Sequence, residues 1–155
     1  MKAGLSTLTV LAACGAASAA IAAPCTADTV AGVWSLVSVR AAEPGVEAFY
    51  AQAPNEWMRF DPDGGYTYVA STRPKTRLAE IQSSLNEADR MDGVTYRIDW
   101  LEAGRMLIRR NDQPFQIFRC EILERAASDA RAGDLILSAD AGMPMLRRVQ
   151  RRVTR

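Results

Sequence analysis

The chain has 155 residues, with 19 basic and 18 acidic side chains, a formal net charge of +1 and no histidine. This length suits one domain with a single core, and the balanced charge excludes the basic excess that drives binding to nucleic acid. The lack of histidine removes the usual general base, the Ser-His-Asp arrangement and most zinc and haem ligands.

Residues 1–22 have the pattern of a secretory signal peptide. Lys2 precedes an uncharged, alanine-rich run, and Ala20-Ile21-Ala22 offers a small-x-small cleavage site. The run is weakly apolar for a retained membrane helix. We therefore expect a folded domain over residues 23–155 with no transmembrane span in the mature protein, located in the periplasm or secreted.

The fate of the three cysteines depends on how this leader is processed. Ordinary cleavage discards Cys14 and leaves Cys25 and Cys120 in an oxidising compartment, which predicts a disulfide between them. In the alternative, Leu11-Ala12-Ala13-Cys14 resembles a lipobox, and a lipid on Cys14 would anchor the protein to a membrane. A catalytic thiol is disfavoured because no histidine is present to activate it.

The first strand of the folded domain is predicted over residues 30–40. It is rich in β-branched residues, and it contains Gly32 and Trp34. The glycine lets a large ring pack against the backbone, and the indole has the size to fill one end of a small barrel. Residues 41–55 are predicted to be a loop, with Phe49 and Tyr50 either covering a barrel mouth or packing on the core.

A β-hairpin is predicted next, over residues 56–71. Its strands flank Asp61-Pro62-Asp63-Gly64-Gly65, a sequence typical of a tight turn. The two aspartates also suggest a calcium loop, but that motif's third acidic ligand and distal glutamate are missing, so turn chemistry is the preferred interpretation.

Helical spacing replaces the strand pattern over residues 72–92. Leu78, Ile81 and Leu85 fall on one face, which predicts a short amphipathic helix beside the barrel or across its opening. The remaining chain alternates apolar and polar residues between turns, and this pattern predicts strands at residues 94–100, 106–110, 115–123, 135–138 and 145–153. Residues 124–133 are predicted to be a polar loop.

These elements predict an all-β fold: a small antiparallel up-and-down β-barrel of about eight strands with one short helical insertion. Alternation along the strands selects an inward set that is apolar and aromatic. This candidate cavity lining comprises Met58, Phe60, Tyr66, Tyr68, Tyr96, Ile98, Trp100, Met106 and Ile108. Such a lining suits a small hydrophobic molecule with a few polar atoms, but the same side chains could equally fill the interior as core.

The sequence resembles the bacterial lipocalin-like domains of the calycin superfamily. The resemblance rests on Gly32-x-Trp34, on the turn Asp63-Gly64-Gly65-Tyr66 and on a closing Arg-Val strand. It implies that an arginine from the last strand packs on the Trp34 indole, and Arg152, which precedes Val153, is the favoured candidate over Arg147, Arg148 and Arg151. The Thr-Asp-Tyr signature of lipocalins has no clear counterpart, so no ligand class is carried over.

Catalytic and metal-binding candidates are few. Asp99 and Glu102 lie near a strand end, but alternation places Asp99 outward. Met143 and Met145 offer thioethers, which suit Cu(I), without a supporting histidine or cysteine nearby. We therefore expect no metal, no cofactor and no catalysis.

The expected function is non-catalytic binding of a small hydrophobic ligand inside the barrel. The alternatives are an envelope structural or protein-interaction module with a filled barrel, lipid-anchored in one version, and a barrel isomerase or cyclase.

Overall fold

The computed structural model describes residues 22–91, 93–102 and 104–154, and the predicted signal peptide and Cys14 lie almost entirely outside them. The described strands are β1 (Ala22–Pro24), β2 (Gly32–Ala41), β3 (Asn55–Phe60), β4 (Tyr66–Ser71), β5 (Tyr96–Glu102), β6 (Arg105–Arg110), β7 (Gln113–Leu123), β8 (Leu135–Ala139) and β9 (Leu146–Arg152). The described helices are α1 (Ala27–Val30), α2 (Pro44–Gln52) and α3 (Leu78–Met91).

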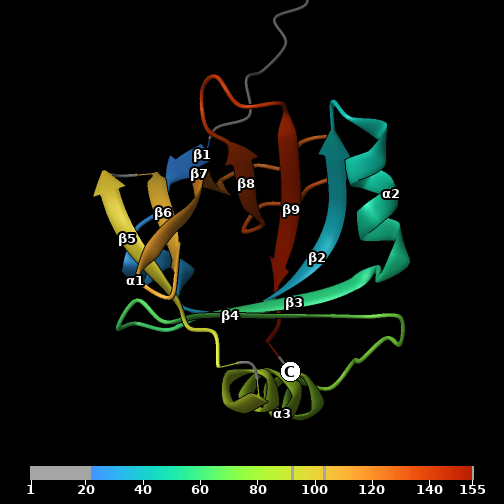
Figure 1. Cartoon of the computed structure of the whole chain (residues 1–155). Coiled ribbons are helices and arrows are strands. Elements are labelled where there is room, and N and C mark those ends of the chain that lie inside the picture. Colours follow the sequence, from blue (N-terminus) through green and yellow to red (C-terminus); the bar gives the residue numbers. More distant parts are fainter. Residues whose placement is uncertain (1–21, 92, 103, 155) are drawn as a thin grey trace, which may run out of the picture.

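The strands form one antiparallel sheet that curls into a half-barrel (Figure 1). Their order is β4-β3-β2-β9-β8-β7-β6-β5, with β1 added beside β7. Strands β2 to β4 pair with their neighbours in sequence, as do β5 to β9, and the pairing of β2 with β9 joins these two groups. The predicted all-β, antiparallel arrangement of about eight strands is confirmed, whereas the predicted closed barrel with one helical insertion is wrong, because the sheet is a half-barrel and the described residues form three helices.

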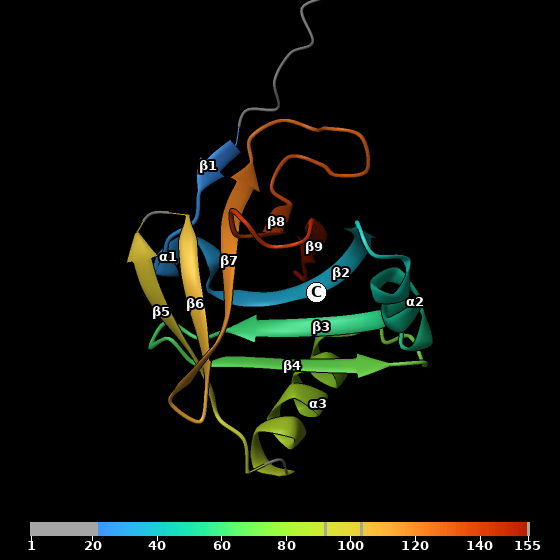
Figure 2. The same ribbon diagram turned by 45° about the horizontal axis from the view of Figure 1, so that its top comes forward.

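The sheet does not close into a complete barrel. β4 and β5 meet at one end only, where Gly65 bridges Arg97 and the Ile98 N–H donates to the Gly64 carbonyl at 2.8 Å. Figure 2 shows β3 and β4 crossing the direction of β5 and β6, so the two strands diverge beyond that contact. Their connection passes through α3, so no tight turn fixes their register. We call this opening between β4 and β5 the seam.

The expected loop over residues 41–55 is wrong for most of its length, because α2 occupies Pro44–Gln52. Pro44 stands in the first turn of the helix, where a missing N–H is tolerated, and a Glu47 carboxylate oxygen accepts the Ala41 N–H at 3.0 Å. The helix lies beside β2 (Figure 1) and has no fully buried residue.

Helix α3 covers the outer face of β3 and β4. Its predicted stripe is confirmed, since Ile81 and Leu85 are buried and pack with Val33 and Trp57. Figures 1 and 2 both show α3 along this side of the sheet. The helix therefore lies beside the half-barrel, with its C-terminal end near the seam.

The Trp34 indole closes one end of the half-barrel. It is fully buried, and its Nε1–H donates to the Val30 carbonyl of α1 at 2.7 Å. The Arg152 guanidinium stacks over the ring at 4.3 Å and also donates to the Ala31 and Thr29 carbonyls at 2.6 and 2.8 Å. This is the arrangement that the lipocalin resemblance implies.

Gly32 makes the Arg152 stacking possible, and its replacement tests this closed end. Gly32 has φ +124°, and an added Cβ would lie 2.7 Å from Arg152 Nη1. We expect Gly32→Ala to lower the free energy of unfolding by about 2 kcal/mol, because it adds backbone strain to a clash. Gly45→Ala is the matched control, since an added Cβ there meets no atom within 4 Å. Urea titrations of both variants make the comparison, and equal stabilities would contradict the assigned role of Gly32.

The predicted disulfide is confirmed: Cys25 and Cys120 are bonded, with Cα atoms 5.4 Å apart. It fastens the segment between β1 and α1 to β7, where the Cys25 N–H also donates to the Cys120 carbonyl at 3.0 Å. A disulfide indicates an oxidising environment, such as the periplasm or the cell exterior. Among the residues that the structure describes, no helix combines the length and apolar character that a membrane crossing requires.

Candidate functional site

Most of the predicted cavity lining belongs to the core. Buried members of the main core cluster are Met58, Phe60, Tyr66, Ile98, Met106 and Ile108, and Tyr96 and Trp100 pack against it half-buried. Tyr68 differs, because 44% of its surface is exposed. The inward direction of this set is as predicted, but most of it contacts other side chains rather than an open space.

The interior behind Trp34 is filled with side chains. Phe118, Leu135 and Leu137 come from β7 and β8, and each is at most 2% exposed. They join Trp34 and Met58 in the same cluster. Close packing of this kind leaves no room for a ligand, so a bound molecule needs space elsewhere in the fold.

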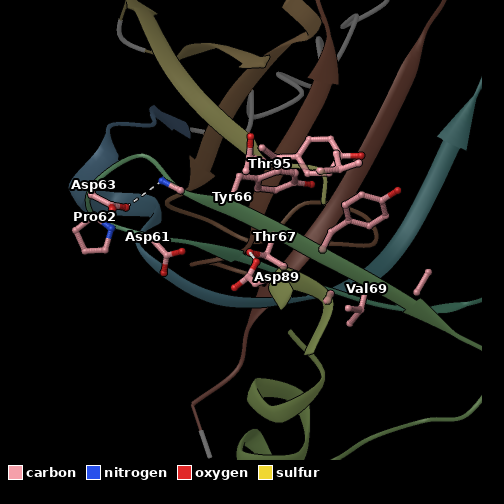
Figure 3. A pocket seen from close by; sticks show the side chains of 14 residues that line it. Asp61, Pro62, Asp63, Tyr66, Thr67, Val69, Asp89 and Thr95 are labelled. Carbon is pink, nitrogen blue, oxygen red and sulfur yellow. Dashed lines mark hydrogen bonds between the residues drawn. The ribbon is translucent and has the colours of Figure 1, made fainter. Parts of the chain in front are cut away.

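The seam supplies that space, because it holds an open cleft of about 900 Å³ (Figure 3). Consecutive residues of β4 form its centre, residues 94–96 form one wall, and the end of α3 and the β3–β4 turn form the others. The lining comprises Asp61, Pro62, Asp63, Gly65, Tyr66, Thr67, Tyr68, Val69, Ala70, Ala88, Asp89, Val94, Thr95 and Tyr96. We call this space the seam cleft.

Three tyrosines form the aromatic side of the seam cleft. The Tyr66 and Tyr68 rings are stacked at 6.3 Å between centroids, and the Tyr96 ring stands edge-on to both, at 6.1 and 5.9 Å. Phe60 packs behind Tyr66, and Phe115, which is 55% exposed, packs against Tyr96 at 6.1 Å. The rings thus form a continuous series from the buried core to solvent. The stacked Tyr66 and Tyr68 rings form one apolar wall of the cleft, and the Tyr96 ring forms a second wall at a steep angle to it.

The Tyr66 and Tyr68 phenols stay protonated at neutral pH. Burial raises the pKa of Tyr66 well above its ordinary value. Burial, followed by the neighbouring Tyr96, also raises the pKa of Tyr68. A neutral phenol carries no charge to repel an apolar ligand, and its O–H can still donate a hydrogen bond. The tyrosines therefore suit a hydrophobic group with a few polar atoms.

Carboxylates lie on the other side of β4, as Figure 3 shows for Asp89 below the strand and Tyr66 above it. Arg59 pairs with Asp89, and its Nε lies 3.0 Å from an Asp61 carboxylate oxygen. The Thr67 hydroxyl also donates to Asp89. These ion pairs hold the end of α3 against the outer face of the hairpin.

Turn chemistry accounts for Asp63. Its carboxylate accepts the Gly65 N–H at 3.1 Å, and Gly64 has φ +88°, which favours glycine. Within the described residues, no group of three or more Asp, Glu, Cys or His side chains is placed to hold a metal ion.

The burial of three inward polar residues was not predicted from the sequence. Glu56 and Arg148 form a buried ion pair, and each side chain is 7% exposed. Gln150 is fully buried, and neither polar atom of its amide has a hydrogen-bond partner among the described residues. Alternation carried the signal, because Glu56 is in phase with Met58, and Arg148 and Gln150 are in phase with the half-buried Leu146.

The remaining sequence candidates lie away from the seam cleft. Asp99 points outward and pairs with Arg109, and Glu102 pairs with Arg105 at 3.1 Å. Met143 and Met145 are 64% and 54% exposed in the turn before β9. None of the four belongs to the lining of the seam cleft.

A scan against protein-family models, a search of curated proteins and a search of solved structures each found no match. The lipocalin-like type therefore stays a prediction from the sequence.

Proposed function

We propose that this chain is a secreted or periplasmic, non-catalytic binding protein of lipocalin-like type that holds a hydrophobic ligand in the seam cleft. The observation that carries the proposal is the convergence of Tyr66, Tyr68 and Tyr96 on an open space of about 900 Å³ at the seam, where β4 and β5 share only the Gly65–Arg97 bridge. Half-buried aromatic walls of this kind are typical of sites for apolar groups.

Binding without chemistry is favoured because the acidic groups nearby are already engaged. Asp61 and Asp89 lie in ion pairs with Arg59, and Asp63 accepts a backbone N–H. The inward carboxylate of Glu56 is paired with Arg148. A general acid or base for an isomerase or cyclase needs a carboxyl that can exchange its proton with the substrate, and these carboxylates are committed to structural partners.

Two kinds of ligand fit this function. The first is a small hydrophobic molecule, as the sequence predicts. The second is an apolar group presented by a partner protein, and the filled interior favours it, because binding is then confined to a surface cleft. Extraction and mass spectrometry of protein purified from its native host separate the two, since only a carrier yields a stoichiometric apolar compound.

Replacement of Tyr68 tests the proposal. We expect Tyr68→Ala to weaken binding of the neutral fluorescent probe N-phenyl-1-naphthylamine roughly tenfold, because it removes one aromatic wall. The side chain is 44% exposed, so the free energy of unfolding should fall by less than about 1 kcal/mol. Fluorescence titration and urea unfolding measure the two effects.

Phe49→Ala is the matched control, because Phe49 is an exposed aromatic residue, 68% accessible, on α2. This variant should bind the probe as the wild type does. Equal binding by Tyr68→Ala and the wild type, or no binding by the wild type, would overturn the proposed site.

A further inference from the structure

The strand edge at the centre of the seam cleft has free backbone groups. The Asp61 N–H donates to the Gly65 carbonyl at 2.9 Å, so this pair of the β3–β4 hairpin is hydrogen-bonded. Hydrogen-bonded and non-hydrogen-bonded pairs alternate along an antiparallel ladder. With Met58 opposite Tyr68 and Glu56 opposite Ala70, the N–H and C=O groups of Tyr68 and Ala70 therefore point away from β3 and into the seam cleft.

The sequence of β4 does nothing to block this edge. Natural sheets commonly protect exposed edges with lysine, proline or a bulge, and β4 has the sequence YTYVAS in unbroken register with β3. In the described part of the chain, β4 gains a second strand neighbour only at the Gly65–Arg97 bridge. The rest of the edge lies open along the cleft.

The two sides of this edge differ in chemistry. Tyr66 and Tyr68 project to the inner side, together with Tyr96 across the seam. On the outer side, Val69 packs with the α3 cluster, and Asp89 lies at the end of α3.

The charge at this site is acidic. The cleft lining holds three carboxylates and no basic residue, while Arg59 and Arg97 contact its acidic end from outside the lining. On the outer side, Asp61 and Asp89 share the single guanidinium of Arg59, so one negative charge is left in excess there, whereas Arg110 lies near Tyr68. This local excess favours a basic ligand group on the outer side.

We infer that the β4 edge binds an extended segment of a partner protein as an added antiparallel strand. Its apolar side chains contact the tyrosines, and its alternate side chains, which are basic, lie on the Val69 and Asp89 side. Strand addition takes its affinity from main-chain hydrogen bonds and its specificity from alternating side-chain sites. This inference rests on the proposed function, because it names a ligand class for the same cleft.

The probe is a capped nine-residue peptide that alternates valine and lysine. In the antiparallel arrangement, residues opposite Tyr68 and Ala70 place their side chains on the tyrosine side and their N–H groups toward β4. N-methylation of the valines should therefore weaken binding at least tenfold, whereas N-methylation of the lysines should leave it unchanged. A peptide of the same composition with its valines and lysines in separate blocks should bind at least tenfold more weakly.

A variant pair tests the edge from the protein side. Ala70→Pro removes an N–H that faces the cleft and keeps the β3 ladder, whereas Ala70→Val keeps the N–H. We expect only the proline variant to lose peptide affinity, by about tenfold. Thermal melting establishes that each variant is folded. If the proline variant does not fold, the methylated peptides still test strand addition on the wild type.

Isothermal titration calorimetry at physiological salt measures the affinities. Any other methylation pattern, equal binding of the block peptide, or no peptide binding overturns the inference. If N-phenyl-1-naphthylamine still binds in a Tyr68-dependent manner, the proposed function stands and strand addition alone fails. If neither probe binds, both fail.

Discussion

Replacing Cys25 and Cys120 with alanine is expected to lower the free energy of unfolding by about 4 kcal/mol. The bond joins positions 95 residues apart, and cross-linking so long a loop removes many conformations from the unfolded chain. Loss of the bond also frees the segment that carries α1, whose Val30 carbonyl accepts the Trp34 indole N–H. We therefore expect backbone amide hydrogen exchange to accelerate first in α1, at the closed end, and only afterwards in the strands of the sheet.

Reduction of the wild type is the control for this variant. Urea titration with dithiothreitol should give the stability of the double alanine variant, because both treatments remove the same cross-link. A variant as stable as the oxidised wild type, within about 1 kcal/mol, would contradict the role assigned to the disulfide.

Removing either partner of the Glu56–Arg148 pair is expected to lower the free energy of unfolding by about 3 to 5 kcal/mol. Both side chains are 7% exposed, and the Arg148 guanidinium also lies 5.3 Å from the centre of the Tyr50 ring. Burial lowers the pKa of Arg148, which shows the energetic penalty of holding its charge away from water. Glu56→Leu or Arg148→Met leaves the other charge buried without its partner.

The double variant Glu56→Leu/Arg148→Met is the matched comparison. It removes both charges, so its stability should return to within about 1.5 kcal/mol of the wild type. Arg77→Ala is the control for an exposed pair, since Arg77 is 81% accessible beside Glu80, and its effect should stay below about 1 kcal/mol. Additive effects of the two single variants would contradict a coupled buried pair.

Local pattern was sufficient to predict most strands. The turn residues Asp61 to Gly65 marked the β3–β4 hairpin, and alternation around Ile98 and Trp100 predicted which side chains of β5 face the core. The stripe of Ile81 and Leu85 likewise gave α3. Helix α2 was missed although Val46, Phe49 and Tyr50 have helical spacing, because its nine residues, which begin with a proline and a glycine, are too few for a clear periodic signal.

The seam could not be predicted from local sequence pattern, because it depends on whether β4 and β5, which α3 separates in the chain, pair with each other. Alternation placed Tyr66, Tyr68 and Tyr96 on the inner face but could not show that β4 and β5 diverge beyond the Gly65–Arg97 bridge. The candidate ligand set was therefore too broad: Met58 and Met106 are fully buried core residues, whereas the tyrosines line the open cleft.

The most direct test of the central claim is a map of backbone amide shifts by ¹⁵N NMR during titration with N-phenyl-1-naphthylamine. We predict that shifts concentrate on Tyr66, Tyr68, Tyr96 and the end of α3, while the Trp34 indole N–H and Leu135 stay unchanged. Shifts centred on Trp34 and Leu135 would place the ligand inside the packed barrel and contradict the account.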